Sequence, residues 1–566
     1  MQIPEFFKEM EENLEEIKSR DQLMEVRKKL AHKYKLRQTP SLIQILCHLS
    51  PESVKKYKDL IITKPTRTIS GVAPVAIMAK PFNCPTQAQC TFCPGGPGSI
   101  YGDTPKSYPG GSPAHRRAER NKYDAYLQVF NRLEHYFLLN QDCSKIELII
   151  MGGTFPTYPK IYRHGFIADA VQAMNDFSDL FYTPEFNLKK FRIFFELPGE
   201  VQDEARTKQI QKKLLEMKKT TTLEREQKIN ETSNIRCVAL CIETRADCAH
   251  KVHIDDMLKL GATRVEVGVQ SLYDDVLKKV ERGNTNADNI KATQMLKDAF
   301  LKVGYHMMLG LPGSSAEQDI QMHKELFANP DYKPDALKVY PCMVFKGTKL
   351  YEQYKKGEFT PINAQEALQR IIQIKQYFPT YCRVMRIQRD IPTYMVEAGV
   401  EKTNLRQEIE QELKKRDMRC RCIRCREPKK KEIDWSAVQL KRLNYEASRG
   451  QELFLSYEDV KNDLLLGFCR IRIPFKPYRP EITANTAGIR ELHVYGTAVQ
   501  IGAQTEKEVQ HKGLGTQLME EAERIAAEEF DAKKMIVIAG IGAREYFKKK
   551  LGYQQDGVYV SKKIKE

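Results

Sequence analysis

The sequence predicts an α/β protein in which a parallel sheet, open or closed into a barrel, is followed by a smaller α/β domain and preceded by a helical basic module. Between residues 71 and 400, short apolar runs alternate with amphipathic stretches, which is typical of parallel strands joined by helices. From residue 436 to 566, strand-like runs surround a glycine-rich turn and an amphipathic helix. Residues 1–70 carry apolar side chains near helical spacing among many charges.

Composition limits the class of protein. The 566 residues are enough for two globular domains or a little more, and no apolar run reaches the roughly 18 residues that a membrane-spanning helix needs. The first residues lack the charged, apolar and small-residue regions of a signal peptide. The 14 cysteines are clustered like metal ligands or scattered singly, which favours a reducing compartment. We therefore expect a cytoplasmic protein without membrane contact.

The excess of positive charge is concentrated in two segments. The net charge is +17, and residues 27–37 carry six fixed positive charges and no acid. A second basic stretch spans residues 419–426 and continues through residues 429–431. Either stretch alone has the ordinary explanation of a solvated helix face, but two of them in a basic protein favour a nucleic-acid partner.

Four apolar runs are the predicted strands of the first sheet: residues 146–151, 238–242, 264–269 and 306–310. In parallel α/β folds, ligand-binding residues gather at the carboxyl ends of the strands. The residues after these runs are polar or glycine-rich: Gly152 and Gly153, Glu243 and Arg245, Gln270 and Ser271, and Gly310 to Gly313. Each glycine pair alone has an ordinary turn explanation, so the signal is the combination of several such strand ends.

Three cysteines within ten residues, Cys84, Cys90 and Cys93, precede these strands. A structural zinc ion takes four protein ligands, whereas a [4Fe–4S] cluster held by three cysteines leaves one iron open to a small molecule. Zinc with a distant fourth ligand is the alternative for this segment alone. The polar, glycine-rich and proline-rich surroundings make simple space-filling a poor explanation.

The second domain has expected strands at residues 453–456, 464–468, 490–494 and 535–539 and a helix at 517–529. The loop from Gln510 to Thr516 contains the spacing Q-x-x-G-x-G and opens this helix. Backbone amides at such a turn, together with the positive end of the helix dipole, form a pyrophosphate site. The spacing matches the acetyl-CoA loop of Gcn5-related acetyltransferases.

Cys420, Cys422 and Cys425 form a further group on the basic segment between the two domains. Their C-x-C-x2-C spacing is most simply explained by three ligands of a structural zinc ion. We expect the fourth ligand to be Cys342, with Cys382 as the competing candidate.

Together, these motifs resemble a known family. The cysteine loop with M-G-G-T-F at 151–155, I-E-T-R at 242–245, R-V-E-V-G-V-Q-S at 264–271 and G-L-P-G at 310–313 resembles radical S-adenosylmethionine enzymes. With C-T-F-C-P-G-G-P at 90–97, I-Q-R-D-I-P at 387–392 and E-L-H-V-Y-G at 491–496, nearly the whole chain resembles the catalytic subunit of Elongator. The five residues between Cys84 and Cys90 depart from the three of the commonest radical-SAM loop, but loop length can vary without loss of three thiolates.

The resemblance implies four regions. Residues 1–70 would be a helical tRNA-binding region, and residues 71–400 a partial TIM-like barrel of the radical-SAM type. Residues 401–435 would be a basic, zinc-binding linker, and residues 436–566 a Gcn5-related acetyltransferase domain.

The same resemblance assigns the candidate site residues. Gly152, Gly153, Glu243, Arg245 and Gln270 would bind S-adenosylmethionine. Acetyl-CoA would contact a larger set: Lys145, Glu491, Leu492, His493, Val494, Gln510, Gly513, Leu514, Gly515, Thr516, Tyr546 and Phe547. Tyr546, His493 and Lys145 are the catalytic candidates among them. Relatives carry a Tyr–Tyr pair where this chain has Tyr546 and Phe547, so one hydroxyl is absent. Apart from the resemblance, Lys145 has the ordinary explanation of a solvated strand-edge lysine.

The function that the resemblance implies is the modification of a tRNA base. A 5′-deoxyadenosyl radical derived from S-adenosylmethionine would activate the acetyl methyl of acetyl-CoA, which would add to C5 of wobble uridine 34 and, after thioester hydrolysis, leave 5-carboxymethyluridine. Bases of a single-stranded anticodon loop can be splayed into such a pocket. A homodimer or accessory subunits are compatible with this function. The alternatives are a protein lysine acetyltransferase with a structural iron–sulfur region and an RNA-binding scaffold with degenerate sites.

Overall fold

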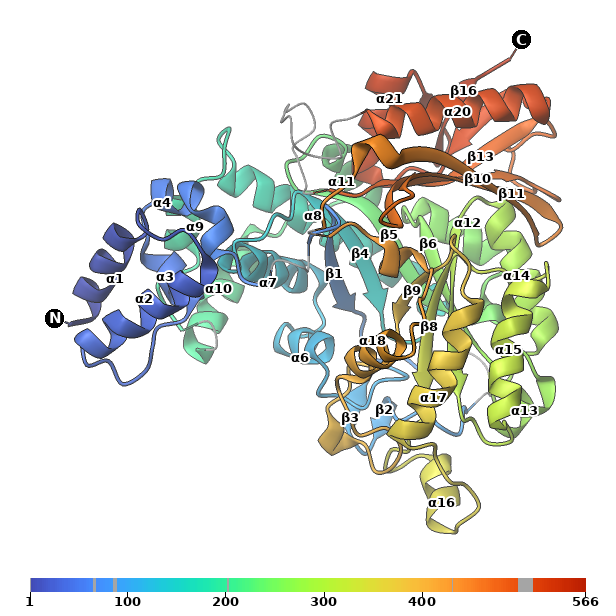
Figure 1. Ribbon diagram of the computed structural model, residues 1–566, viewed down its shortest axis with the longest axis horizontal. Coiled ribbons are helices and arrows are strands. Elements are labelled where there is room, and N and C mark those ends of the chain that lie inside the picture. The colour runs from blue at the N-terminus through green and yellow to red at the C-terminus, as the bar shows by residue number, and fades with distance from the viewer. Residues whose placement is uncertain are drawn as a thin grey trace.

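The computed structural model confirms the predicted α/β fold (Figure 1). It describes residues 2–64, 68–84, 89–200, 203–429, 431–496 and 513–565. A curled parallel sheet forms the centre of the molecule, a second sheet lies above one end of it, and the N-terminal helices lie to one side. Among the described residues, no helix combines the length and the apolar character that crossing a membrane requires.

Five short helices form the N-terminal module: α1 (Gln2–Asn13), α2 (Arg20–Lys33), α3 (Leu42–His48), α4 (Pro51–Lys56) and α5 (Lys58–Ile61). Ser19, Ser41 and Ser50 cap α2, α3 and α4 by accepting hydrogen bonds from backbone amides in the first turns. The apolar side chains of the module pack into a core of their own. The basic run of residues 27–37 lies along α2 and just beyond it, with most of its charges in solvent.

The first sheet contains seven parallel strands in chain order: β1 (Ala73–Met78), β4 (Lys145–Met151), β5 (Arg236–Thr244), β6 (Arg264–Gln270), β7 (Lys302–Leu309), β8 (Ala336–Pro341) and β9 (Arg383–Arg386). Parallel strands in chain order, joined by helices, produce a sheet that curls towards a barrel. The strands β1 and β9 form the two edges and do not pair with each other. The sheet is therefore a half-barrel that is open between β1 and β9.

The other elements of this part of the chain connect the strands. A small two-stranded sheet consists of β2 (Gly96–Ser99) and β3 (Gly102–Thr104). The helices are α6 (Pro113–Arg120), α7 (Ala125–Leu138), α8 (Lys160–Phe181), α9 (Leu188–Phe194), α10 (Glu204–Met217), α11 (Leu223–Asn230), α12 (Lys251–Lys259), α13 (Asp274–Lys279), α14 (Asn286–Asp298), α15 (Ala316–Ala328), α16 (Lys349–Lys355), α17 (Ala364–Ile374), α18 (Leu405–Lys415) and α19 (Ile423–Arg426). Their apolar faces and the strands bury one large core.

The second sheet has the order β10–β11–β12–β13–β14–β16–β15. Its strands are β10 (Val438–Ala447), β11 (Gly450–Asp459), β12 (Leu464–Ile473), β13 (Thr486–Val494), β14 (Lys534–Val537), β15 (Gln554–Asp556) and β16 (Tyr559–Lys563), with helices α20 (Leu514–Glu529) and α21 (Arg544–Leu551). The parallel pairing of β13 with β14 ends at Ile489 and Val537, whereas β13 pairs with β12 as far as Val494. The two central strands therefore diverge beyond Ile489.

Two glycines allow the second sheet to touch the half-barrel. A Cβ at Gly540, just after β14, would lie 1.9 Å from the carbonyl oxygen of Val238 in β5. A Cβ at Gly488 in β13 would lie 2.2 Å from the ring of Phe300, which follows α14. Only a residue without a side chain permits such an approach of backbone to its neighbour. The second sheet is thus packed against the amino-terminal ends of the barrel strands.

The variant Gly540→Ala is expected to push the segment after β14 away from Val238 of β5 and so to destabilise the protein. The neighbouring atom is a backbone carbonyl of a buried strand, so it cannot move aside as a flexible side chain would. We expect a loss of at least about 1–3 kcal/mol in unfolding free energy, measured by urea unfolding. Gly165→Ala in α8 is the matched control, because a Cβ there meets no atom within 4 Å. Equal unfolding curves for the two variants would contradict the close contact.

Candidate functional site

One cavity of about 2700 Å³ connects the two ends of the half-barrel. At the carboxyl ends of the strands, its lining includes Cys84, Cys90 and Cys93. At the amino-terminal ends, it includes Lys145 at the start of β4 and residues of β13 in the second sheet. The interior faces of the barrel strands line the space between. The predicted cysteine loop and the predicted acetyl-CoA residues therefore open into the same cavity.

The cysteine loop is fixed by hydrogen bonds to its backbone and to its sulfurs. The amide of Thr91 donates to the carbonyl of Val280 at 3.0 Å, and the Thr91 carbonyl accepts from the Leu350 amide at 2.9 Å. A guanidinium nitrogen of Arg282 lies 3.3 Å from Cys90 Sγ, and the Ser107 amide lies 3.3 Å from Cys93 Sγ. The N–H donor to Cys93 favours its thiolate, the form that binds metal, although burial outweighs it and raises the pKa of Cys93.

The spacing of these sulfurs argues against a single zinc ion in the loop. Sulfurs on one tetrahedral zinc are about 3.8 Å apart, because each Zn–S bond is about 2.3 Å. Among the described residues, the sulfurs of Cys84, Cys90 and Cys93 do not all lie within 4.8 Å of one another. Ligands on different irons of one cluster are spread more widely, which suits this arrangement.

Most residues expected to bind S-adenosylmethionine lie beside this loop. Gly153, Glu243, Arg245 and Gln270 line the cavity. Gln270 has a φ of 69°, a strained value for a residue with a side chain and one common at binding sites. Gly152 is not part of the lining; its carbonyl accepts a hydrogen bond from Tyr158 behind the cavity wall.

Several buried polar groups at this end lack partners within the described part of the chain, and two of them follow the predicted strands. One is a terminal guanidinium nitrogen of Arg245, whose other nitrogens pair with Asp247 at 2.9 and 3.0 Å. The other is Thr154 Oγ1, directly after the glycine pair. An unpaired buried donor costs free energy unless a ligand satisfies it, so this end of the cavity is suited to a polar ligand.

A network of ion pairs lies inside the half-barrel. The sequence analysis did not predict it. Arg264 pairs with Glu147 at 2.7 Å and with Glu266 at 3.2 Å. Lys338 contacts Glu266 and lies 3.1 Å from Glu243. These side chains come from β4, β5, β6 and β8 and line the cavity between its two ends. The signal was present as charged residues inside otherwise apolar strands, such as R-V-E-V at 264–267.

His493 on β13 is a half-buried, neutral imidazole. Burial, followed by the charges of Arg383 and Lys302, lowers the pKa of His493 to about 4, although Glu491 opposes the shift. Its ring lies 4.4 Å from the ring of Tyr495. Its Nε2 atom has no hydrogen-bond partner in the described part of the chain, and His493 lines the cavity.

The neighbouring candidates differ in their surroundings. Glu491 is ion-paired with Lys302 at 2.5 Å and with Arg470 at 2.8 Å; these two cations outweigh burial and lower the pKa of Glu491 to about 2. Tyr546 lies against the start of α20, where its hydroxyl hydrogen-bonds with Thr516, and burial raises its pKa. Burial and the nearby Arg236 lower the pKa of Lys145.

The structure places the rest of the predicted acetyl-CoA set as follows. Leu492, Val494, Gly513, Gly515 and Phe547 line the cavity. Leu514 packs instead in a small core with Leu464 and Leu466, and Gln510 lies outside the described residues. Phe547 is 6% exposed and also joins the core of the second sheet, with its ring 6.0 Å from that of Tyr553.

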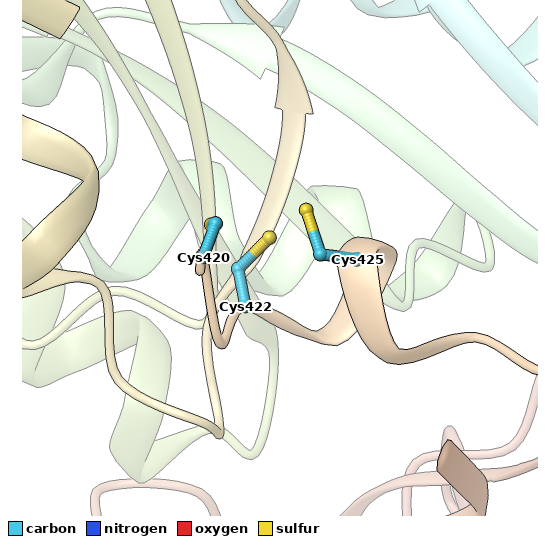
Figure 2. Close-up of side chains that lie close together, drawn as sticks. All are labelled: Cys420, Cys422 and Cys425. Carbon is cyan, nitrogen blue, oxygen red and sulfur yellow. The ribbon is translucent and has the colours of Figure 1, made fainter. Parts of the chain in front are cut away.

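Cys420, Cys422 and Cys425 come together beside β9 (Figure 2). Their sulfurs lie within 4.8 Å of one another, close enough for a single metal ion. Hydrogen bonds from Cys420 and Cys425 lower the pKa of the Cys422 thiol well below its usual range.

The expected fourth cysteine is not part of this group. Cys342 packs in a different core, with Phe92 and Met308, beyond the carboxyl end of β8. Cys382 instead shares a core with Cys420 and Cys422, and its carbonyl accepts from the Ile423 amide at 3.0 Å. Neither cysteine belongs to the group of three sulfurs that lie within 4.8 Å of one another, but of the two only Cys382 contacts the segment that carries them.

The second basic stretch divides into two parts. Arg419 and Arg424 line the cavity, as do Lys429 and Lys431. Arg426 is 1% exposed and forms ion pairs with Glu458 at 2.5 Å and Asp463 at 2.7 Å. Arg426 therefore holds the segment against the second sheet and is not available to a ligand.

Family models match almost the whole chain. The ELP3 N-terminal domain matches residues 6–69, the radical SAM superfamily residues 82–326, the radical SAM C-terminal domain residues 334–415, and the acetyltransferase (GNAT) family residues 414–553.

Several curated proteins are similar over their full length. A protein named tRNA uridine(34) acetyltransferase from Methanocaldococcus infernus is 46% identical over 533 residues, 93% of this chain and 92% of that protein. Elongator complex protein 3 of Saccharomyces cerevisiae is 40% identical, covering 95% of this chain and 91% of that protein. The human protein of the same name is 37% identical, covering 96% and 93%. A solved structure of the Methanocaldococcus infernus Elp3 with an N-terminal deletion (1–46) superimposes with a TM-score of 0.71 and 43% identity, covering 88% of this chain and 100% of that one.

Proposed function

Because this chain belongs to the family of the tRNA uridine(34) acetyltransferases and Elongator complex protein 3, we propose that it modifies the wobble uridine of tRNA. The chain is an enzyme with a radical SAM and an acetyltransferase domain. We propose 5-carboxymethyluridine as its product. The observation that carries the proposal is the single cavity that reaches both the cysteine loop and the β13 edge.

Three cysteines would hold the cofactor. Cys84, Cys90 and Cys93 would ligate a [4Fe–4S] cluster, and the unpaired donors of Arg245 and Thr154 would face the S-adenosylmethionine on its open iron. When bound, this pair supplies a carbon radical able to take hydrogen from an unactivated methyl group, which polar acid–base chemistry does not do. Gly153, Glu243 and Gln270 would complete the binding surface, with Gly152 shaping the turn behind it.

The gap between β13 and β14 suits acetyl-CoA. Beyond Ile489 the strands diverge, so the pantetheine arm would lie along Glu491, Leu492, His493 and Val494. The start of α20 at Gly513, Leu514, Gly515 and Thr516 would bind the pyrophosphate, helped by Gln510. Tyr546 would orient the thioester carbonyl, and Lys145, from the opposite wall, would contact the acetyl group. Phe547 would supply only an apolar wall.

His493 would act as the base for hydrolysis of the thioester. A neutral imidazole with an unsatisfied ring nitrogen can accept a proton from water, which then attacks the thioester carbon and releases CoA. Because the thioester would lie inside a cavity, bulk water would have restricted access to it, which limits hydrolysis of acetyl-CoA before the acetyl group has been transferred.

The low pKa of His493 gives a pH prediction. A histidine with a folded pKa of about 4 keeps its basic form at every pH above that value, so thioester cleavage should be flat from pH 8 to pH 5 and should fall only below pH 5. The measurement is release of CoA thiol against pH, corrected for binding of acetyl-CoA. A fall centred near pH 6.5, the value of an unperturbed histidine, would show that another group is the base.

We further propose a structural zinc ion on Cys420, Cys422 and Cys425. The closeness of the three sulfurs supports this site, and Cys382 would be the fourth ligand in place of Cys342. Such an ion would hold the basic segment beside β9. All 14 cysteines are free of disulfides, in keeping with the cytoplasmic location that we propose.

The proposed function is tested by product analysis. The protein is reconstituted anaerobically with iron and sulfide and incubated with S-adenosylmethionine, acetyl-CoA, reductant and a tRNA transcript, and the nucleosides are analysed by mass spectrometry. We expect 5-carboxymethyluridine with U34 and none with a matched transcript that carries C34. Acetylation of a basic peptide, without dependence on S-adenosylmethionine, would instead support a protein acetyltransferase.

A further inference from the structure

The cavity extends through the open side of the half-barrel to two helices next to β1. A guanidinium nitrogen of Arg117 in α6 donates to the carbonyl of Ala76 on the free edge of β1 at 2.6 Å. From α7, Asn131, Arg132 and His135 line the same cavity. We call Arg117, Arg120, Asn131, Arg132 and His135 the α6–α7 face. None of these residues belongs to the predicted cofactor sites.

Two arginines of the α6–α7 face lack an anionic partner. Among the described residues, no carboxylate lies within 4.0 Å of the charged nitrogens of Arg120 or Arg132, although the chain forms many ion pairs elsewhere. Arg132 is 9% exposed, and its guanidinium lies 4.1 Å from the ring centre of Tyr136. A largely buried cation without a counter-charge is costly, so this site favours an anionic ligand.

The pKa of His135 shows that the α6–α7 face is electrostatically positive. Burial and the positive charges of Arg132, Arg117, Arg120 and Arg206 together lower its pKa to about 3. The imidazole is therefore neutral at physiological pH, and the positive field at this point comes from the arginines. That field is directed at the cavity, because Arg117, Arg120 and Arg132 all line it.

Asn131 lies beside Glu134, whose carboxylate is held by Arg206 at 2.5 Å. The acceptor that Asn131 adds to the face is its side-chain oxygen, Oδ1. This oxygen is buried and has no partner in the described part of the chain. It therefore requires a donor from a ligand.

We propose that the α6–α7 face binds one ribose-phosphate unit of an RNA strand, with Arg120 and Arg132 on the phosphate and Asn131 Oδ1 on the 2′-hydroxyl. The choice of RNA over another phosphorylated ligand rests on the proposed function. A phosphate is favoured by cations that no carboxylate contacts within ion-pair distance, and the 2′-hydroxyl is the donor by which a protein distinguishes RNA from DNA. The subsite would anchor the loop strand at the open side while its base enters the barrel.

The test uses a fluorescent anticodon stem-loop RNA and the same stem-loop with 2′-deoxy sugars throughout the loop. Arg132→Met keeps an apolar stem on Tyr136 but removes the charge, so we expect about tenfold weaker binding of both probes. The slope of log affinity against log salt should fall by about 1. Arg120→Met, at an exposed position where folding is not at risk, should act in the same direction.

Asn131→Ala should act on one probe only. We expect it to weaken the ribose loop to the level of the deoxyribose loop and leave the latter unchanged, so that discrimination between them disappears. Arg225→Met is the matched control, because Arg225 is an exposed cation on α11 outside the cavity. Acetyl-CoA binding and urea unfolding verify that each variant is folded.

Two outcomes would overturn the proposal. One is unchanged affinity for both probes in folded Arg120, Asn131 and Arg132 variants. The other is a loss of acetyl-CoA binding in Arg132→Met with RNA binding intact, which would assign the face to the phosphates of CoA. If the wild-type protein forms no carboxymethylated base yet shows the expected binding pattern, the subsite is supported and only the proposed function fails.

Discussion

Replacement of Cys90 by alanine is expected to abolish product formation. The variant leaves two thiolates where the cavity end has three, and it removes the sulfur to which Arg282 donates. Two cysteines cannot hold a cluster in the geometry that leaves one iron open. We expect no iron-linked absorbance after anaerobic reconstitution and no 5-carboxymethyluridine above background, measured by iron analysis and nucleoside mass spectrometry.

A matched cysteine elsewhere shows whether the effect belongs to the loop. Cys143 is 2% exposed within the barrel core and is 50 residues from Cys93, so Cys143→Ala should retain iron despite a modest loss of stability. Binding of acetyl-CoA should be unchanged in Cys90→Ala, because its predicted residues lie at the other end of the cavity. Undiminished product in Cys90→Ala would exclude the radical mechanism.

The sequence predicted four inner strands of the first sheet because most of their residues are apolar; β6 and β7 are buried along nearly their whole length, whereas β4 buries alternate residues. The runs at 146–151, 238–242, 264–269 and 306–310 correspond to β4, β5, β6 and β7, with small differences at their ends. Such strands are nearly continuous apolar segments, which a sequence displays directly.

Three strands that the sequence did not indicate are edge strands. β1 contains Pro74, which an edge strand tolerates because one side of its backbone needs no partner. β9 is only four residues long and has an arginine at each end. β10 is largely exposed and polar. β9 and β10 therefore lack an apolar signal, as protected edge strands do, whereas β1 is apolar throughout and is interrupted only by its proline.

Apart from the resemblance, the residues themselves indicated mainly those parts of the site whose members are close in sequence. The three-cysteine loop is local, and so are Cys420, Cys422 and Cys425. Cys342 follows the carboxyl end of β8, whereas the segment of Cys420, Cys422 and Cys425 contacts Cys382 at the amino end of β9, and the fourth ligand of this group stays a prediction. Cys342 and Cys382 differ in the end of the barrel at which they lie, and the spacing of cysteines in the sequence does not reveal this. The charges inside the half-barrel and the α6–α7 face arise in the same way from tertiary contacts.

A fully buried ion network joins the two sheets. Arg490 of β13 contacts Asp335, which precedes β8, and lies 2.8 Å from Glu452 of β11. Arg472 of β12 pairs with Asp298 at the end of α14 at 2.6 Å and with Glu452 at 2.9 Å. All five side chains are 0% exposed. These ion pairs therefore hold the acetyltransferase sheet to the barrel. Because the side chains are buried, water cannot solvate a charge whose partner has been removed.

Arg490→Met is expected to lower the unfolding free energy by about 3–5 kcal/mol, because it leaves Asp335 and Glu452 buried without their main partner. The single tryptophan, Trp435, lies just before β10 and provides a fluorescence signal from this part of the molecule during urea unfolding. Acetyl-CoA binding should weaken as well, because Arg490 directly precedes Glu491, a predicted acetyl-CoA residue on β13.

The matched control is another cation of the same network. Lys297 is also 0% exposed and lies 3.7 Å from Asp335 and 3.6 Å from Glu452, but burial lowers its pKa to about 8. Without Lys297, the cations of the network balance its anions: Arg470, Arg472, Arg490 and Lys302 against Asp298, Asp335, Glu452 and Glu491. Lys297→Met should therefore cost less than about 1 kcal/mol, since it removes the surplus charge and keeps the volume. Equal losses in the two variants would mean that volume, and not charge balance, holds the acetyltransferase sheet on the barrel.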